Sequence, residues 1–347
     1  MIEISLLSSS EEKSYSTFLK NSSESMFFHS IPYKNLLEEL LSVKSFFLIA
    51  KKNEQIIGAL PLFQKKNEEY GNILNSSPFI GSNGGFLIDS HLDFLKQREI
   101  KQSLLENMYE IAGMENCILS TIISSPFDRD TIFYEDFIKY SYRGYRVGHI
   151  KHLNNTFSCP EESILKTVDK RCRNTITRSM KNLELEHSDD FETLFILHKK
   201  NMEKKGASFK PLKFFELIKK YFSPEEYELT YALKNGEPMA GLLVFFFKDT
   251  VEYFTPAFNY DYRTEQPTSF LIFHSMKKAI QNGYKYWNFG GTILPSQTGV
   301  ANFKKSWGSF EYPYYYYTIK HQDIDKILKL KSEVILENYR WFYVIPF

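Results

Sequence analysis

Residues 46–63 read FFLIAKKNEQIIGALPLF, and residues 228–246 read ELTYALKNGEPMAGLLVFF. Each stretch is a β-rich run, a polar turn built on Lys-Asn, and a second β-rich run that opens with a glycine. Asparagine readily takes the positive φ of a tight turn, and Asn235-Gly236 is a strong hairpin signal. Both stretches therefore predict a β-hairpin, and their separation of about 180 residues is that of a repeated domain rather than a solenoid.

The elements expected around the two hairpins follow one order: two helices, the hairpin, a strand, a helix and a strand. In the first half these are helices at 11–20 and 33–41, a strand at 71–74, a helix at 94–112 and a strand at 116–123. In the second half they are helices at 189–204 and 211–221, a strand at 250–257, a helix at 268–282 and a strand at 284–289. A strand at 312–320 and a helix at 323–338 end the chain. This order predicts an α+β protein of two tandem domains, each with a mixed sheet, and a boundary near residues 149–155.

Composition limits the classes of function. The 347 residues carry 43 Lys and Arg against 42 Asp and Glu, so the net charge of +1 provides no overall attraction to nucleic acid or to an acidic membrane. The cysteines lack CxxC spacing, and the histidines and carboxylates lack metal-ligand spacing, so no disulfide framework or metal site is expected. We find no signal peptide and no apolar run long enough for a membrane span, and therefore expect a cytoplasmic protein.

Five segments carry a resemblance to a known family. The first half contains FFHSIPYKNLLEEL, IIGALPLF and LNSSPFIGSNGGFL, and the second contains KRCRNTITRSMKN and the pair NGYKYWNFGGT and GVANFKKSWG. Together with the repeated order of elements, these segments resemble the Fem (FemAB-like) family of peptidoglycan aminoacyltransferases and its BioF2-like acetyltransferase relatives. Those proteins use the GNAT acyltransferase fold twice in one chain. The long coiled-coil arm that some members insert in the second domain has no counterpart here.

The resemblance implies two tandem GNAT-like domains, at residues 1–152 and 153–319, with residues 320–347 packing back on the first. It implies an acyltransferase that moves an aminoacyl or acyl group from an activated carrier to an amine of a cell-envelope precursor, as in peptidoglycan bridge synthesis. The donor would be aminoacyl-tRNA or acyl-CoA, used as a substrate, with no bound cofactor. The expected partners are a nucleotide- or lipid-linked envelope precursor and charged tRNA.

A first candidate site is WNFGGTILPSQTGVANFKKSWGS, residues 287–309. Gly290 and Gly291 would let the backbone approach a ligand closely. We expect Lys304 at the start of a short helix, where its ammonium and free backbone N–H groups would hold a phosphate or carboxylate. The alternative from spacing alone is a solvated lysine pair beside core aromatics. In the Fem family the lysine of this Phe-Lys motif is implicated in binding or transfer, which assigns that role to Lys304, with Phe303 and the two glycines as binding residues.

A second candidate site is KRCRNTITRSMK, residues 170–181. On a helix, Arg171 and Arg178 fall on one face and Arg173 on a neighbouring face, with no acidic residue in between. An unpaired basic face fits a diphosphate or a tRNA backbone, so these three arginines are expected to hold the carrier or a nucleotide-linked acceptor. The alternative is an ordinary amphipathic helix with a solvated basic face.

A third candidate is VEYFTPAFNYDYR, residues 251–263, which corresponds to the strand that lines the acyl-transfer centre in GNAT enzymes. Glu252, Tyr253, Tyr260 and Asp261 are its groups that can carry a proton. A carboxylate can accept a proton from the attacking amine, and a tyrosine can protonate the leaving group. We expect Tyr253 or Asp261 to assist proton movement. The alternatives are that the tyrosine only packs, or that the substrate's own groups act.

Two loops bear on the substrates. GNAT enzymes that use acyl-CoA usually carry a Gln/Arg-x-x-Gly-x-Gly/Ala loop that cradles pyrophosphate, whereas residues 262–273, YRTEQPTSFLIF, contain no glycine. This difference favours another activated donor. The glycine-rich residues 75–86 are interpreted as lining of the acceptor cleft, with a plain surface loop as the alternative. Two other functions stay open: an acyl-CoA-dependent N-acyltransferase acting on an amino sugar of a surface polysaccharide, and a catalytically inactive binding module.

Overall fold

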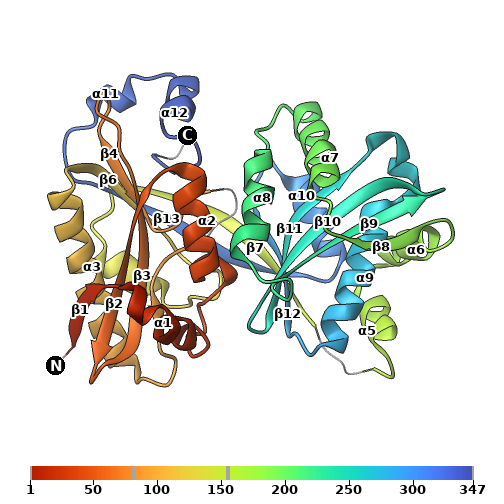
Figure 1. The fold of residues 1–347 in the computed structure, drawn as a ribbon. Helices are drawn as coiled ribbons and strands as arrows, with labels where there is room; N and C mark the ends of the chain where they lie inside the picture. The colour runs from red at the N-terminus through yellow and green to blue at the C-terminus, as the bar shows by residue number, and fades with distance from the viewer. Residues whose placement is uncertain (1, 80–82, 154–156, 346–347) are drawn as a thin grey trace. The chain divides into compact units, whose positions relative to one another are not determined.

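The computed structural model describes residues 2–79, 83–153 and 157–345 (Figure 1). The chain divides into two compact units: unit 1 comprises residues 1–146 and 313–347, and unit 2 comprises residues 147–312. Each unit has helices packed on one mixed sheet, which confirms the expected α+β class. Part of the expected boundary, residues 154–155, lies outside the described residues.

Unit 1 contains a mixed sheet. Its strands are β1 (Glu3–Leu6), β2 (Lys44–Lys52), β3 (Gln55–Lys65), β4 (Asn72–Asn75), β5 (Leu87–Ile88), β6 (Cys117–Ile123) and most of β13 (Phe310–Lys320). The strand order is β1-β2-β3-β4-β6-β13, and β5 pairs with β3. Neighbours are antiparallel except β4 and β6, which are parallel.

Helices pack on the sheet of unit 1, and not all of them begin at a side-chain cap. They are α1 (Glu12–Leu19), α2 (Ile31–Leu41), α3 (Phe94–Met114), α4 (Thr131–Phe137), α11 (Asp325–Leu328) and α12 (Ser332–Asn338), with 3₁₀ turns at Ser9–Glu11 and Phe27–His29. The Asp93 carboxylate accepts a hydrogen bond from the Lys96 N–H at the start of α3, and the Ser30 hydroxyl accepts one from the Tyr33 N–H at the start of α2. Each cap satisfies a backbone donor that the helix itself leaves unpaired.

The sheet of unit 2 repeats that of unit 1. Its strands are β7 (Tyr142–His152), β8 (Glu184–Ser188), β9 (Tyr227–Lys234), β10 (Glu237–Phe247), β11 (Thr250–Phe258) and β12 (Tyr286–Thr292). The order is β8-β9-β10-β11-β12-β7. Again all neighbours are antiparallel except one pair, β11 and β12, which are parallel. The two halves of the chain therefore share one sheet topology.

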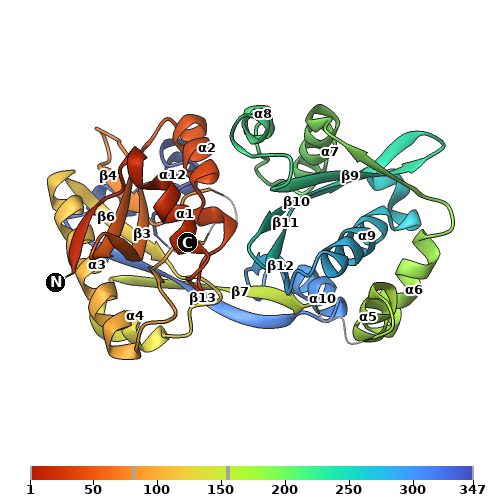
Figure 2. The same cartoon turned by 60° about the horizontal axis from the view of Figure 1, so that its bottom comes forward.

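The helices of unit 2 lie on both faces of its sheet. They are α5 (Pro160–Thr167), α6 (Lys170–Ser179), α7 (Phe191–Lys204), α8 (Leu212–Tyr221), α9 (Pro267–Gln281) and α10 (Thr298–Ser306), with a 3₁₀ segment at Tyr260–Glu265. Figure 2 shows α7 and α8 on one face and α9 on the other. Aspartates cap α6 and α7, whereas α9 begins at Gln266 without a side-chain cap. Pro267 has no N–H, and the Ser269 N–H donates to the Gln266 carbonyl oxygen, so the first turn of α9 leaves the Thr268 N–H for another partner.

Strands β7 and β13 carry the chain from one unit to the other. The chain passes from unit 1 to unit 2 within β7, whose residues from Val147 onward pair with β12. It returns to unit 1 within β13, whose residues from Tyr316 onward pair with β6. The C-terminal residues 313–347 consequently belong to the unit that begins the chain.

Strand alternation places a helix layer on each face of a sheet. In unit 1, Leu48 of β2 packs with Leu104 of α3 in the main core cluster, while the neighbouring Phe47 packs its ring edge-on to Tyr15 of α1 at 5.8 Å. In unit 2, Val244 of β10 belongs to the cluster that contains α9, whereas Phe254 of β11 stacks on Phe214 of α8. Successive side chains thus fill two separate cores.

Both predicted hairpins are confirmed, at β2–β3 and β9–β10. Asn53 and Asn235 take φ values of 50° and 54°, the left-handed conformation that the tight turns require. The glycine that follows each turn permits close helix packing. A Cβ on Gly58 would lie 2.5 Å from Ile100 Cγ2 of α3, and one on Gly241 would lie 2.9 Å from Leu194 Cδ1 of α7.

Two expected elements differ in the structure. The helix expected at 323–338 is two short helices, α11 and α12. These helices place Ile324, Ile335 and Tyr339 in a core cluster with strands β4 and β6 of unit 1. The strand expected at 250–257 is confirmed as β11, but the longer candidate segment 251–263 is a strand only as far as Phe258, and the 3₁₀ segment that follows takes Asp261 off the strand.

Candidate active site

A cavity of about 620 Å³ lies in unit 2 beside the part of β11 that no longer pairs with β12. The two parallel strands pair only as far as Glu252 and Asn288. Beyond that point β11, the start of α9, α10 and the end of α7 surround the cavity. Its apolar wall is formed by Tyr253, Pro256, Phe258, Val300 and Phe303, and its cationic residues are Lys205, Arg263 and Lys304. The arrangement suits a group with an apolar part and a negative part.

Lys304 lies in the last turn of α10, so the expectation that it starts a helix is wrong. Its side chain is buried, and Nζ donates to the carbonyl oxygens of Gly290 and Gly291 at 3.0 Å each. Burial lowers the pKa of this amine to about 7. The residue therefore carries a proton that it can keep or lose near neutral pH, and backbone carbonyls rather than helix N–H groups hold it in place.

Gly290 and Gly291 act as acceptors for Lys304, and neither lines the cavity. Gly290 takes a φ of 71°, and its N–H donates to Asn288 Oδ1 at 2.9 Å. Phe303 does line the cavity and is 37% exposed. The expected contact of the two glycines with a ligand is thus replaced by an indirect one, through the lysine that they orient.

Tyr253 and Asp261 are separated by the structure. Tyr253 lines the cavity and packs against Trp287 and Phe289, and burial raises the pKa of its hydroxyl, so it stays protonated at neutral pH. Asp261 is exposed in the 3₁₀ segment and is not among the residues around the cavity. The strand assignment that grouped the two residues was wrong because the chain turns after Phe258.

Glu252 is a buried carboxyl on β11, one residue from Tyr253 and on the opposite face of the strand. Asn288 Nδ2 donates to Glu252 Oε2 at 2.8 Å, and Oε1 is buried with no hydrogen-bond partner among the described residues. Burial raises the pKa of this carboxyl to about 8, although the bond from Asn288 opposes the shift. In the sequence, Glu252 lies within the otherwise largely apolar run Val251–Phe254. This position was the signal that could have favoured Glu252 over Asp261 as the buried carboxyl.

The arginines of the basic helix α6 lie in two different environments. Arg171 and Arg178 line an open cavity of about 420 Å³ together with Gln266, the residue before α9. Arg173 points elsewhere: its guanidinium donates to the carbonyl oxygens of Leu165 at 2.8 Å and Val168 at 3.4 Å. The structure thus brings two of the three predicted arginines together, and the third supports the end of α5.

The loop before α9 keeps a left-handed residue without glycine. Gln266 takes φ 61° and ψ 43°, a conformation that glycine adopts most easily. Residues Gln266 to Ser269 all line the 620 Å³ cavity, at the uncapped end of α9. One left-handed residue is therefore present in this loop without a glycine, and the choice between an acyl-CoA and another activated donor stays a prediction.

Within residues 2–79, 83–153 and 157–345, no group of three or more His, Cys, Asp or Glu side chains is arranged to hold a metal ion. None of the helices in the described part of the chain is both long and apolar enough to cross a bilayer. Residues 80–82, in the middle of the glycine-rich segment expected to line the acceptor cleft, lie outside the described residues.

Sequence comparison identifies the fold of unit 2. Residues 170–305 match the family described as acetyltransferase (GNAT) domain. The match covers most of unit 2, which is therefore similar in sequence to a GNAT domain. The match includes the whole 620 Å³ cavity and the basic helix. No curated protein sequence matches the chain significantly.

Solved structures extend the similarity to both units. The chain is similar to FemX, with 15% identity, a TM-score of 0.71, and coverage of 90% of this chain and 96% of that one. It is similar to a C-terminal domain assigned to a lysylphosphatidylglycerol synthetase of Agrobacterium fabrum, with 13% identity, a TM-score of 0.57, and coverage of 98% and 100%. It is also similar to a tandem GNAT protein from the clavulanic acid biosynthesis pathway, with 8% identity, a TM-score of 0.53, and coverage of 93% of this chain and 100% of that one. The tandem GNAT fold and the structural resemblance to FemX are thereby confirmed. The expected acyltransferase class agrees with the match of residues 170–305 to an acetyltransferase (GNAT) domain.

Proposed function

We propose that the protein is an amide-forming enzyme that moves an aminoacyl or acyl group from an activated carrier to an amine of a cell-envelope precursor, as Fem-type enzymes do in peptidoglycan bridge synthesis. The observation that carries the proposal is the cavity of unit 2, which both Lys304 and Tyr253 line, beside the strand position that lines the transfer centre in GNAT enzymes. The fold similarity to FemX and to a domain assigned to a lysylphosphatidylglycerol synthetase supports an envelope-directed acceptor.

Lys304 would stabilise the negative charge that develops on the tetrahedral intermediate. An ammonium has three N–H groups, and two of them donate to Gly290 and Gly291, which leaves one for the substrate. Because the carbonyls fix the amine in advance, little reorganisation is needed when the charge forms. The same group could contact a carrier phosphate only in its protonated form.

Proton movement would use the tyrosine of β11 that lines the cavity. The Tyr253 hydroxyl, kept protonated by its raised pKa, would donate to the leaving group there. The attacking amine and the ester or thioester would have to meet in this same cavity, because the new amide bond forms between them. Glu252 is buried on the opposite face of β11, so it is given no contact with the amine.

The carrier would be held at the start of α9. The uncapped N-terminal turn, Arg263 and Lys205 face the cavity, and the arginines of α6 line the neighbouring cavity across Gln266. Backbone N–H groups at a helix start and arginine side chains both bind phosphate well. Phosphate groups are shared by a charged tRNA and by coenzyme A, so this surface supports either donor.

A second candidate, an acyl-CoA-dependent N-acyltransferase acting on an amino sugar, is favoured by one observation. Gln266 reproduces the left-handed turn that acyl-CoA sites usually build with glycine. In this case the pyrophosphate would lie against the first turn of α9 and the acyl chain against Phe258 and Phe303.

The test combines donor binding with turnover. Native mass spectrometry of the whole protein with acetyl-CoA, a longer acyl-CoA and a pool of charged tRNA should show selective retention of one donor. Transfer to nucleotide-linked envelope precursors should then fall about a hundredfold in Lys304→Ala, the usual loss for one donor to an oxyanion. The control is Lys305→Ala, because Lys305 is half-exposed and pairs with Glu311 at 3.2 Å.

Three results would discriminate. Retention of charged tRNA supports the aminoacyl route, and retention of a CoA thioester supports the second candidate. Wild-type turnover in Lys304→Ala would contradict the proposed role of the lysine.

A further inference from the structure

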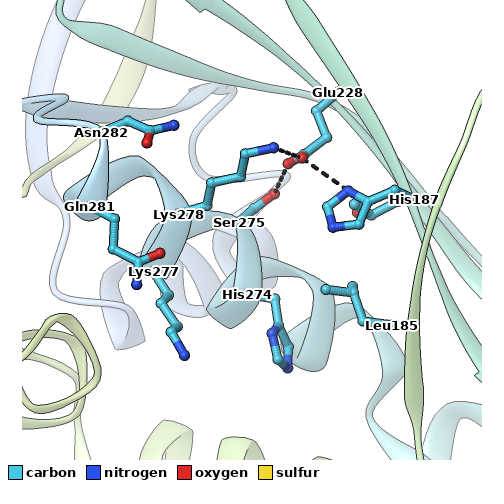
Figure 3. A pocket seen from close by; sticks show the side chains of 10 residues that line it. Leu185, His187, Glu228, His274, Ser275, Lys277, Lys278, Gln281 and Asn282 are labelled. Carbon is cyan, nitrogen blue, oxygen red and sulfur yellow. Dashed lines mark hydrogen bonds and ion pairs between the residues drawn. The ribbon is translucent and has the colours of Figure 1, made fainter.

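Unit 2 contains another cavity, of about 400 Å³, between strands β8 and β9 and the C-terminal half of α9 (Figure 3). Apart from Leu185, its lining residues are polar: His187, Glu228, Thr230, His274, Ser275, Lys277, Lys278, Gln281 and Asn282. Helix α9 also borders the 620 Å³ cavity of the candidate active site, here called the acyl cavity, but the two cavities have no lining residue in common. The proposed reaction makes no use of any of these residues.

Glu228 is the carboxylate of this cavity, and its oxygens are already occupied. Figure 3 shows Lys278, His187 and Ser275 converging on it. Lys278 Nζ pairs with Oε1, His187 Nδ1 lies 3.1 Å from the same oxygen, and Ser275 Oγ lies 3.4 Å from Oε2. The carboxylate therefore offers little to a cationic ligand.

Two polar side-chain atoms of the same cavity lack a hydrogen-bond partner among the described residues. Thr230 is 2% exposed, and its Oγ1 is buried without a hydrogen-bond partner among the described residues. His274 Nε2 is in the same state. Unsatisfied buried polar atoms cost free energy, so a folded protein that keeps them together in a cavity indicates a missing partner.

The charges around the cavity favour a negative ligand. Lys278 has further N–H groups beyond the one that meets Glu228. Lys277 is paired with Glu161 of α5, which leaves its charge near the cavity edge but partly balanced. Gln281 and Asn282 each add an amide N–H₂ donor and an amide oxygen acceptor. The lining has two lysines, Lys277 and Lys278, against one carboxylate, Glu228, and this balance of charge favours an anion.

We propose that this cavity is a second ligand site of unit 2, which takes a small oxyanion: a phosphate or a carboxylate group. Thr230 and His274 would donate to the ligand from opposite walls, and Lys278 would share its ammonium between Glu228 and the ligand. The inference does not depend on the identity of the acyl donor, because it uses neither the acyl cavity nor the α6 arginines.

The test is a titration of the full-length protein, labelled at histidine, with sodium phosphate and separately with sodium acetate. Sodium chloride at equal ionic strength controls for screening. The His274 and His187 imidazole signals should shift saturably with at least one oxyanion and not with chloride. Preference for phosphate would identify a phosphoryl ligand and preference for acetate a carboxylate; both support the site.

Matched variants sharpen the result. Thr230→Val removes an unpartnered hydroxyl without changing shape, so it should fold normally and bind the anion several-fold more weakly. Lys278→Gln should weaken binding about tenfold, the effect of one charge-assisted contact. Thr255→Val is the control, because Thr255 Oγ1 is equally buried and unpartnered but lies outside the cavity. Absence of a saturable shift, or wild-type affinity in both Thr230→Val and Lys278→Gln, would overturn the proposal.

Discussion

Lys304 and Glu252 are buried ionisable groups whose environments shift their pKa values in opposite directions. Burial lowers the pKa of the Lys304 amine from 10.5 to about 7 and raises that of the Glu252 carboxyl from 4.5 to about 8. Both shifts favour the uncharged form, because each group has lost water without gaining a charged partner. Both groups therefore titrate near neutral pH; Lys304 lines the cavity, whereas Glu252 lies on the opposite face of β11.

The Lys304 shift predicts how stability depends on pH. Between about pH 7 and 10.5 the folded amine has lost a proton that the unfolded chain still holds, so this group makes the free energy of unfolding rise with pH. The variant Lys304→Met should lack that rise. Urea unfolding of both proteins at several pH values in this window measures it, and parallel curves would contradict the burial of the amine.

The Glu252 shift predicts the opposite slope. Between pH 4.5 and about 8 the folded carboxyl keeps a proton that the unfolded chain has released, so its contribution to stability falls as pH rises. Glu252→Gln should therefore gain stability relative to wild type across this window. Thermal unfolding at constant ionic strength would show it. An unchanged difference between the two proteins would mean that the carboxyl is ionised in the folded state.

Helix α6 shows how one sequence pattern serves two purposes. Arg171 and Arg178 face a cavity next to the start of α9, whereas Arg173 bonds backbone carbonyls at the end of α5. The helical period separates these faces, but only the neighbouring elements decide which face meets a ligand.

The division of α6 predicts different losses. The double variant Arg171→Gln, Arg178→Gln should weaken donor binding and lower its salt dependence, since two phosphate contacts are removed. Arg173→Gln should instead lower the free energy of unfolding by about 1 kcal/mol, the usual net value of a hydrogen bond, and leave the salt dependence unchanged. Donor titrations at two salt concentrations, with urea unfolding of each variant, separate the outcomes. Equal effects of both variants on binding would contradict the division.

For the molecule as a whole, the exchange of end strands ties the two halves of the chain together. Strand β13 pairs with β6 in unit 1, and Ile324, Ile335 and Tyr339 cover Ile118 there. Residues 1–146 alone would therefore lack the strand that pairs with β6 and part of the core cluster around Ile118, although they contain a complete copy of the sequence repeat.

This exchange predicts the outcome of truncation. A protein ending at Tyr312 should lose the cooperative unfolding of unit 1, because β6 loses its neighbour and an apolar surface is exposed. Proteolysis followed by mass spectrometry should find early cuts within residues 1–146 and later cuts within 147–312. Equal protection of both segments would show that residues 313–347 are dispensable for unit 1.

Much of the fold could be predicted from local pattern. The hairpins at β2–β3 and β9–β10, the helices α1, α2, α3, α7, α8 and α9 and the repeat itself follow from period, turn residues and caps, which act within a few residues along the chain. The sequence alone also indicated the GNAT resemblance and the importance of Lys304, since the Phe-Lys motif and the paired glycines are contiguous.

Only the tertiary structure decided what each side chain meets. Whether Lys304 begins or ends a helix, whether Asp261 or Glu252 is the buried carboxyl, and which α6 arginine faces a cavity depend on contacts between residues far apart in sequence. Gln266 shows the same limit, because its left-handed turn is imposed by the packing around α9 and not by its own preference. Periodicity determines which residues can share a face, and packing determines which face is buried and how its pKa values shift.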